Sequence, residues 1–466
     1  MQFKKFMFAG LALTMMASCQ KEFEQNSSLN EGDAYMSLSI EMPNVDGKRA
    51  INGGHETSAG TVGEQKITSL KLYVFDAQTG QLQNEGNINF KMNDLKPYNP
   101  SVGADKTITY TIPAFKIKGG EKKVLVIVNP LDEKFTDQTA QTVMGETMTL
   151  TEKEIKTVSS EGKFMMTNVN RASDTDGMVS VTVDGTETNP TNVTVEVERV
   201  VAKIEDMTTN YEIEVKDNSN NDVVVFQKVA LINGNTKFYP IMKVKDNVED
   251  DANDYVQDPN FEGQSDQTVA DFYSKEFTAK TFDNVGDNVK ALSSEENAAN
   301  ALFYTLENTM TANEQMNAYT TGLYYQAQYK LGGQEGNVYK FGENLYTWSQ
   351  LSSNAGSLGL NLTNVTDKSP IAAFASIGVQ KFENGVCYYK YWIRHISNND
   401  PSTMGAMEFA VVRNNHYQMV IKSVSGIGEN VPTNPETTDP DEEADSFLDV
   451  KMKVLPWVVR VNNIDF

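Results

Sequence analysis

The side chains that most often carry out chemistry are scarce in this chain. Its 466 residues include three histidines and two cysteines, and no pair of cysteines has zinc-site spacing. The motifs His-Glu-x-x-His and Gly-x-Ser-x-Gly and a phosphate-binding Gly-rich loop are absent. His55, His395 and His416 lie far apart, and the sequence nominates no nucleophile for them. We therefore expect no catalytic residue, no metal, no cofactor and no enzymatic activity.

Three other patterns are weak matches to binding motifs. Residues 425–429, Ser-Gly-Ile-Gly-Glu, resemble half of a dinucleotide loop, but no helix is predicted after them. Asp217–Asp222 and Asp439–Asp445 have the carboxylate density of a calcium site without its Gly and closing Glu. Solvated turns explain both acidic stretches better.

Cys19 is the one residue whose neighbours indicate a definite reaction. Lys4 and Lys5 precede an apolar stretch, Phe6–Met16, and small residues lead into the cysteine, which is the order of a secretory signal. That stretch is shorter than the roughly 20 apolar residues of a membrane span. A Cys directly after Ala-Ser is the acceptor arrangement of bacterial lipoproteins, in which the thiol takes a diacylglycerol. The sequence thus predicts a signal peptide over residues 1–18 and lipidation of Cys19; an ordinary signal with an incidental cysteine is the alternative.

The net charge and the number of cysteines exclude further kinds of binding and cross-linking. The net charge of -23 and the pI near 4.6 argue against binding nucleic acid or an anionic membrane through the body of the protein. Any membrane attachment would then use only the N-terminal lipid of the precursor. With Cys19 lipidated, Cys387 has no partner for an intramolecular disulfide, and we interpret it as a small apolar strand residue.

The first element that could position functional residues is a strand over Tyr35–Met42. Its side chains alternate between apolar and polar, which is typical of a half-buried strand. Pro43 and a turn-rich loop with the dibasic step Lys48-Arg49 follow it. The apolar residues of this strand are Met36, Leu38, Ile40 and Met42.

The same two-residue period recurs along the chain, with Gly, Asn and Asp turns between the strands. This pattern predicts an all-β protein of antiparallel β-sandwiches. Strands are predicted over 67–75, 123–128, 193–204, 371–379, 386–393, 411–424 and 447–461, among others, and short helices over 151–158, 293–304 and 345–351. The predicted organisation is a signal peptide (1–18), a lipidated propeptide with the N-terminal strand (19–49), an N-terminal sandwich (50–195), a C-terminal sandwich (196–446) and a C-terminal segment (447–466).

Several short motifs, in order from end to end, resemble the fimbrillins of type V pili. They include Cys19, the Lys48-Arg49-Ala50 loop, 70–76 (LKLYVFD), 124–129 (VLVIVN), 164–168 (FMMTN) and 198–204 (ERVVAKI). The C-terminal motifs 304–309 (YTLENT), 385–389 (GVCYY), 412–417 (VRNNHY) and 455–457 (LPW) are similar to the Mfa branch of that family.

The resemblance implies a structural subunit with two transthyretin-like sandwich domains. It further implies export as a lipoprotein bearing palmitate, anchored at the outer membrane, and cleavage between Arg49 and Ala50 by an Arg-specific, gingipain-like protease. The mature subunits would then join head-to-tail by donor-strand exchange into an adhesive fimbrium on the cell surface. Implied partners are identical subunits, accessory tip and anchor subunits, and host or bacterial receptors.

The geometry of strands gives a physical mechanism for cleavage and strand exchange. A strand over Met36–Met42 can cover an apolar groove, and its loss after cleavage would expose about 25 Å of groove. The predicted donor strand lies at the other end of the chain, where five apolar side chains worth about 2 kcal/mol each would bury about 10 kcal/mol gross. Those donor residues are Trp457, Val459, Val461, Ile464 and Phe466.

Two other interpretations remain open from the sequence. The first is a lipid-anchored surface glycan-binding lipoprotein, with Trp348, Trp392 and nearby tyrosines as its binding platform. The second is a tip or anchor subunit of the same pilus, which accepts a strand and need not donate one. For the C-terminus, the alternative to a donor is an ordinary final strand of the second domain.

Overall fold

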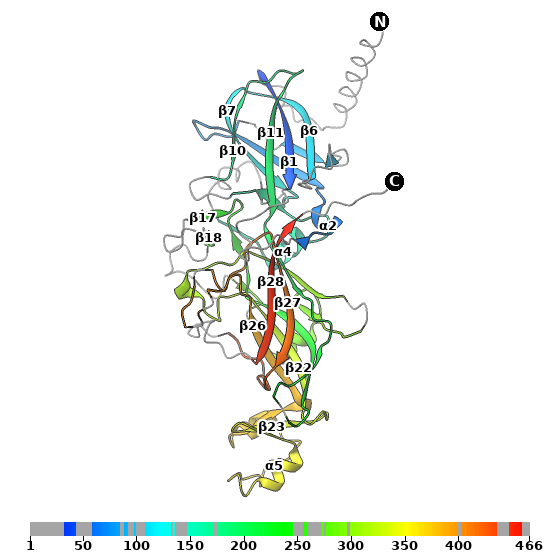
Figure 1. Cartoon of the computed structure of the whole chain (residues 1–466). Coiled ribbons are helices and arrows are strands. Elements are labelled where there is room, and N and C mark those ends of the chain that lie inside the picture. The colour runs from blue at the N-terminus through cyan, green and yellow to red at the C-terminus, as the bar shows by residue number, and fades with distance from the viewer. Residues whose placement is uncertain are drawn as a thin grey trace.

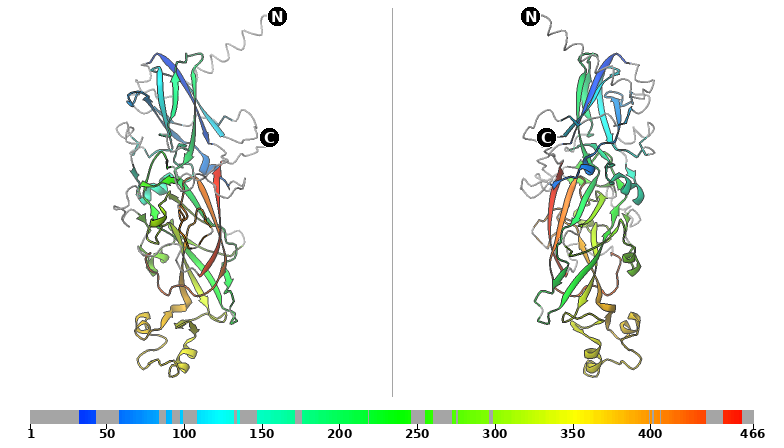
Figure 2. Two further views of the ribbon diagram at one scale, coloured as in Figure 1. Left: turned by 60° about the vertical axis from the view of Figure 1, so that its left-hand side comes forward. Right: turned by 90° about the vertical axis from the view of Figure 1, so that its right-hand side faces the viewer.

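Strands are the main regular element of the described residues, and in several of them, such as Ala34–Met42 and Thr191–Arg199, buried and more exposed side chains alternate. The computed structural model describes residues 32–42, 58–83, 88–91, 97–98, 108–131, 134–135, 147–170, 176–217, 219–245, 255–259, 272–274, 276–295, 299–398, 400, 402–405, 407–435 and 447–458. The molecule is elongated: a first sandwich lies at one end, a second lies in the middle, and a small subdomain projects at the other end (Figure 1). Two further views show the same order (Figure 2). The predicted all-β sandwich fold is confirmed.

The first sandwich is built on one sheet of nine described strands that wraps around a single core. Its central strands are rich in Val, Leu, Ile and Phe, and both faces of β3 are buried. Along the sheet the order is β4 (Ile88–Lys91), β3 (Ser69–Asp76), β7 (Gly120–Val128), β9 (Met166–Asn168), β11 (Thr191–Arg199), β1 (Ala34–Met42), β6 (Ile108–Ile117) and β5 (Pro97–Tyr98), with β10 (Val179–Val183) paired to β7.

The second sandwich packs two sheets over a core rich in tyrosine and valine. One sheet has the order β2 (Ser58–Ala59), β28 (Leu448–Val458), β27 (Asn415–Val424), β12 (Val201–Asp206) and β21 (Ala301–Leu306). The other has the order β13 (Glu212–Glu214), β14 (Val223–Ile232), β22 (Gly322–Lys330) and β26 (Val386–Trp392), with β20 (Val289–Ala291) paired to β14.

The projecting subdomain lies between β22 and β26 in the chain and has its own core. It consists of β23 (Val338–Phe341), β24 (Asn344–Tyr346), β25 (Gln380–Phe382), α5 (Trp348–Asn354), α6 (Ile371–Ala375) and the 3₁₀ turn η7 (Glu383–Gly385). The remaining short elements are α2 (Val62–Gln65), α4 (Glu152–Val158), η5 (Ala279–Asp283), η6 (Ala312–Glu314) and the strand pairs β8 (Met148–Thr149) with β16 (Lys237–Phe238), β15 (Gly234–Asn235) with β19 (Phe272–Tyr273), and β17 (Lys243–Lys245) with β18 (Tyr255–Gln257).

After β11 the chain passes from the first sandwich to the second at a single residue. The predicted boundary near residue 195 falls inside β11, and the change of sheet occurs at Val200, between β11 and β12. Residues 193–204, predicted as one strand, are therefore two. The pairing of β8 with β16 and the hydrogen bond from Thr167 Oγ1 to the carbonyl of Pro240 (2.6 Å) also connect the two sandwiches.

Two element types differ from the sequence prediction. The helix predicted over 293–304 is replaced by β21, whose Ala301 and Phe303 face the second core. The strand predicted over 371–379 is instead the helix α6, in which Phe374 packs on Tyr339 with ring centroids 4.9 Å apart. Burial of one face in each case outweighs local propensity. The helix predicted over 151–158 is confirmed as α4, which begins with a capping box between Thr151 and Glu154.

Candidate functional site

The strand β1 lies inside the first sheet, not at its edge. It pairs with β11 in parallel and with β6 in antiparallel orientation. Among the described pairs of this sheet, β1–β11 is the only parallel one. Both neighbours lie far from β1 in the sequence, so no hairpin connects β1 to either of them. Residues far apart in the sequence thus enclose the first strand of the described chain.

The inward face of β1 is completely covered. Met36, Leu38 and Ile40 are 0% exposed, and Met42 is 3% exposed. These are the four side chains that the sequence predicts for the covering strand. On the outward face, the hydroxyls of Ser37 and Ser39 donate to Oδ1 of Asn192 on β11, at 3.2 and 3.3 Å. At about 2 kcal/mol each, burial of the four inward side chains contributes about 8 kcal/mol before entropy costs.

The start of β1 is also held in place. The carboxylate of Asp33 accepts a hydrogen bond of 2.7 Å from the backbone N–H of Gly119, and this bond is the main reason that the pKa of Asp33 lies below its ordinary value. The N–H of Tyr35 donates to the carbonyl of Gly185 at 2.9 Å. A Cβ on Gly185 would lie 2.6 Å from the carbonyl oxygen of Tyr35, so this close approach requires glycine.

The end of β1 leads directly to the predicted processing loop. Residues 43–57 lie outside the described residues, and the predicted cleavage residues Arg49 and Ala50 fall within them. The next described element, β2, pairs with β28 in the sheet of the second sandwich. Covalently, β1 is therefore connected to the rest of the described chain only through residues 43–57. The predicted lipidation residue Cys19 lies outside the described residues as well.

The C-terminal strand β28 differs from the predicted donor segment. Leu448–Val458 pairs antiparallel with β27, and Val450, Met452 and Val454 pack against the second core of the same chain. The alternative of an ordinary final strand therefore describes residues 448–458. The predicted donor residues Val459, Val461, Ile464 and Phe466 lie outside the described residues.

Trp457 requires a specific correction to the donor set. Its side chain is 1% exposed, stacks on Tyr304 with centroids 5.8 Å apart, and meets the edge of Phe164 at 5.5 Å. The guanidinium of Arg199 lies 4.2 Å from its ring centroid and donates to its carbonyl at 2.8 Å. Trp457 thus joins the two sandwiches of its own chain, and we remove it from the donor set. Sequence pattern alone missed this role because Trp457 sits in alternation with the apolar residues on either side of it.

A short segment after the processing loop covers this junction. In α2, Thr61 and Glu64 form a capping box, and this T-x-x-E spacing is a sequence signal that the strand-based analysis missed. Oε1 of Glu64 accepts from Nζ of Lys203 at 2.9 Å and from the hydroxyl of Tyr304 at 2.6 Å. A Cβ on Gly60 would lie 3.0 Å from Nε1 of Trp457, so the segment passes close over the indole.

The histidines take structural positions in the described chain. Nδ1 of His416 lies 2.5 Å from Oγ of Ser58, and its Nε2 lies 2.8 Å from Oε2 of Glu205. Nδ1 of His395 is buried 2.7 Å from the hydroxyl of Tyr417. His55 lies outside the described residues. The two described histidines therefore do not share a site.

The structure does not assemble the predicted glycan platform. Trp392 is 6% exposed and packs in a cluster with Phe282 and Tyr324. Trp348 belongs to the separate core of the projecting subdomain, where it meets Phe374 edge to face at 5.9 Å. The two tryptophans lie in different hydrophobic clusters, so they form no common surface.

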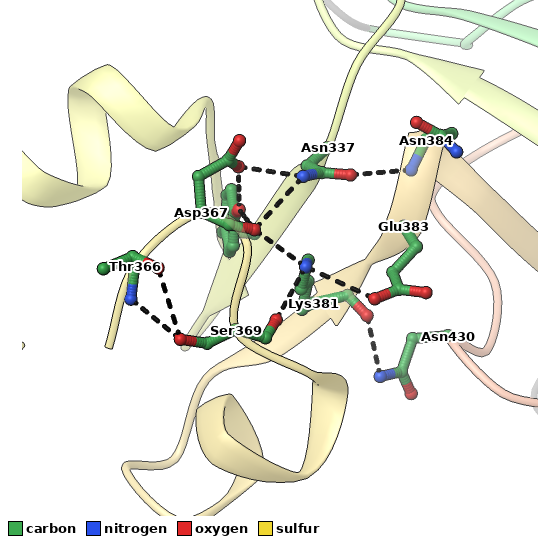
Figure 3. A network of polar contacts seen from close by, with 9 residues as sticks. Asn337, Thr366, Asp367, Ser369, Lys381, Glu383, Asn384 and Asn430 are labelled. Carbon is green, nitrogen blue, oxygen red and sulfur yellow. Dashed lines mark hydrogen bonds and ion pairs between the residues drawn. The ribbon is translucent and has the colours of Figure 1, made fainter. Parts of the chain in front are cut away.

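The most extensive polar network of the projecting subdomain has a structural role (Figure 3). Nζ of Lys381 donates to the carbonyls of Asp367 and Ser369, both at 2.8 Å. Oδ1 of Asn337 accepts from the N–H of Asn384 at 2.8 Å. Because these groups bond to backbone atoms of neighbouring loops, the network fastens the loops of the subdomain together.

The described residues hold neither a cluster of metal-ligating side chains nor a membrane-spanning helix. No group of three or more His, Cys, Asp or Glu side chains in the described part of the chain gathers where it could hold a metal ion. The carboxylate of Asp222, in the first acidic stretch, accepts hydrogen bonds from Tyr329 and from the N–H of Gly332. Asp439–Asp445 lies outside the described residues. Among the described helices, none has the length and apolar character needed to cross a membrane.

Two sandwiches joined through a shared junction, with an embedded first strand, define an all-β structural subunit. Two family models match this chain: major fimbrial subunit protein (FimA) over residues 34–199, and the C-terminal fimbrillin model of major fimbrial subunit proteins over residues 380–463. No curated protein matches the chain in sequence. The chain belongs to the fimbrillins, and it is a subunit of a cell-surface fimbrium.

Solved structures of related fold include adhesion and fimbrial proteins. A candidate cell adhesion protein from Parabacteroides distasonis has 15% identity and a TM-score of 0.49, with 91% of this chain and 99% of that chain covered. The tip fimbrial protein Mfa3 from Porphyromonas gingivalis, truncated at its C-terminus, has 14% identity and a TM-score of 0.42, with 91% and 100% covered. A fimbrial assembly protein from Parabacteroides distasonis has 12% identity and a TM-score of 0.37, with 83% and 90% covered.

Proposed function

We propose that this fimbrillin is a shaft subunit of the Mfa branch that polymerises by strand exchange after proteolysis. The observation that supports this function is the place of β1, a central strand joined to the described chain only through residues 43–57. Cleavage after Arg49 leaves β1 held by non-covalent contacts alone. Loss of a central strand then has a larger effect than loss of an edge strand, because it breaks two ladders at once.

The physical consequence of losing β1 is an open groove about 30 Å long between β11 and β6. Both strands lose their hydrogen-bond partner on the side of the groove, and the apolar walls that cover Leu38 and Ile40 become exposed. Unpaired strand edges beside an apolar groove are a template for another strand. Residues 459–466 of a neighbouring subunit supply one, with Val459, Val461, Ile464 and Phe466 as its apolar side chains. Head-to-tail contacts of this kind do not close, so they produce filaments.

The earlier steps place the subunit on the cell surface before it assembles. The precursor is exported through the signal over residues 1–18, lipidated at Cys19 and held at the outer membrane by that lipid. An Arg-specific, gingipain-like protease then separates the propeptide, residues 19–49, from the mature chain. Tip and anchor subunits cap the filament, and host or bacterial receptors bind it. A donor segment beyond β28 favours a shaft subunit over a tip subunit, which need not donate.

Electron microscopy of the purified precursor, with and without Arg-specific proteolysis, tests this function. Filaments are expected only after cleavage of the wild-type chain, and Arg49→Ala should remain monomeric with β1 retained. Lys48→Ala is the matched control and should polymerise normally. Signal removal and cleavage after Arg49 together remove 49 residues with five basic and six acidic groups, so the net charge changes only from -23 to -22. Filaments formed by Arg49→Ala at the wild-type rate would exclude the mechanism.

A further inference from the structure

The groove that β1 fills has opposite charges at its two ends. Near the end of β1, Glu41 pairs with Glu196 on the parallel neighbour β11. Near its start, Tyr35 pairs with Lys116 on β6, and the exposed Lys118 follows two residues later. An incoming strand therefore meets a carboxylate beside the site of Met42 and an ammonium group beside the site of Tyr35.

Apolar pattern alone does not choose the direction of the incoming strand. The inward residues of β1 are two positions apart in the sequence. The apolar residues of the segment 459–466 are instead two, three and two positions apart. One extra residue at Asn462-Asn463, as in a β-bulge, brings the donor into the same phase as β1. With that bulge, the four donor side chains match the four inward sites of β1 in either direction.

Charge distinguishes the two directions. If the donor runs opposite to β1, Val459 takes the site of Met42, and Arg460 takes the place of Glu41 and faces Glu196. Asp465 then takes the place of Ser37, next to the lysine end of the groove. If the donor runs in the same direction as β1, Asp465 faces Glu196 instead. Opposite charges on paired positions of neighbouring strands stabilise the pair, and like charges destabilise it.

We propose that Glu196 determines the direction of strand insertion, so that the donor of one subunit runs antiparallel to the displaced β1 with its Arg460 against Glu196 of the next subunit. This inference rests on the strand exchange proposed above. It assigns a specificity role to an exposed residue of β11 that sequence pattern alone gives no reason to single out.

Disulfide trapping in protease-treated, full-length protein tests the direction. Neighbouring strands place paired residues within disulfide reach, and the native Cys387 is fully buried. The double variant Val195→Cys with Val461→Cys keeps Glu196, Arg460 and Asp465, and it should give a ladder of cross-linked subunits under oxidation because Val461 then takes the site of Ile40, which pairs with Val195. Val195→Cys with Ile464→Cys is the matched comparison and should give no ladder. A ladder only in the second variant would overturn the direction.

A charge exchange gives an independent kinetic test. Glu196→Lys should slow polymerisation roughly fivefold, and Arg460→Glu in the same chain should restore the rate. Insertion in the opposite direction predicts that Glu196→Lys speeds assembly, because it would face Asp465; a faster or unchanged rate overturns the proposal. Unchanged melting of the uncleaved variants shows that they fold, and Glu196→Gln, expected to slow assembly about twofold, replaces Glu196→Lys if it does not fold.

Failure of strand exchange itself has a different signature. A chain lacking residues 459–466 that still polymerises after cleavage would exclude the proposed function, and the direction proposal with it. If that deletion abolishes polymerisation, strand exchange stands, and the pattern of cross-links decides the direction alone.

Discussion

Glu64 is a buried acid at the junction between the two sandwiches. It is 3% exposed and holds Lys203, Tyr304 and the first turn of α2. Burial alone would raise the pKa of Glu64, but hydrogen bonds from Tyr304, from the N–H of Thr61 and from Lys203 bring it below the ordinary value. The ionised carboxylate is therefore the form that the folded junction stabilises.

This lowered pKa predicts an acid-dependent loss of stability. Because the folded pKa lies below the ordinary value of 4.5, the contribution of Glu64 is fully present above that pH and is lost as the pH falls through the folded pKa. Glu64→Gln should cost about 3 kcal/mol at neutral pH and should flatten the decline in melting temperature between about pH 5 and pH 3. The exposed Glu343→Gln is the control. An equal acid-dependent decline in Glu64→Gln and the wild type would refute the assignment.

At the scale of the element, β1 combines complete burial with weak covalent attachment. Its neighbours β11 and β6 come from distant parts of the chain, and in the described topology they do not pair with each other. A strand held in this way can leave without unfolding the hairpins of the sheet. The burial of its four inward side chains nevertheless makes its departure slow until another strand can replace it.

A reversible lock on β1 should therefore block assembly after cleavage. Ser39 pairs with Thr111 across β1 and β6, so Ser39→Cys with Thr111→Cys falls within the Cα separation that a disulfide needs. The oxidised variant should be cleaved by the Arg-specific protease yet remain monomeric, and a reductant should start polymerisation, as followed by light scattering. Either single variant should behave like the wild type. Filaments from the oxidised, locked protein would contradict strand displacement.

Two truncations at the C-terminus should differ sharply in their effect on the stability of the monomer. Removing residues 459–466 should abolish polymerisation and leave the melting temperature of the monomer within a few degrees of the wild type, because β28 and Trp457 remain in place. Removing residues 457–466 also deletes the buried indole and should cost about 3–5 kcal/mol. Calorimetry of both truncated monomers measures the difference. Similar large losses in both would mean that residues 459–466 belong to the core of their own domain.

At the scale of the whole molecule, the segment that follows the predicted cleavage site lies beside the C-terminal strand β28. The parallel pairing of β2 with β28 brings the segment that follows the processing loop against the strand that precedes residues 459–466. Both lie at the junction of the two sandwiches, and the projecting subdomain lies at the far end of the second (Figure 1). In the proposed mechanism, proteolysis and donor release therefore concern the same region of the subunit, away from the projecting subdomain.

The predicted anchor is tested on the intact precursor. Cys19→Ala should incorporate no fatty acid, and the precursor should fail to reach the outer surface, since the thiol is the acceptor for the diacylglycerol. Metabolic labelling with palmitate, together with surface proteolysis of whole cells, measures both effects. Cys387→Ala is the matched control, because that thiol is fully buried. Label retained in the Cys19→Ala protein would exclude lipidation at this position.

Local pattern in the amino-acid sequence is enough to predict the all-β character of this chain, although not the type of every element. The alternation over Tyr35–Met42 predicts which four side chains of β1 point inward, and the structure buries those four. A short helix over 151–158 is likewise predicted from local pattern, and the structure forms it as α4 with a capping box at its start. These features follow from contacts between near neighbours in the chain, so a short window of residues carries the information.

Pairing partners were decided only by the tertiary structure. No local period shows that β1 lies parallel to β11, that the chain changes sandwich at Val200, or that Trp457 packs on Arg199. An apolar side chain in an alternating strand has the same pattern whether it fills its own core, an interdomain junction or a neighbour's groove. What separates these cases is which distant strand offers an unpaired edge and a matching cavity, and that depends on the assembled chain as a whole.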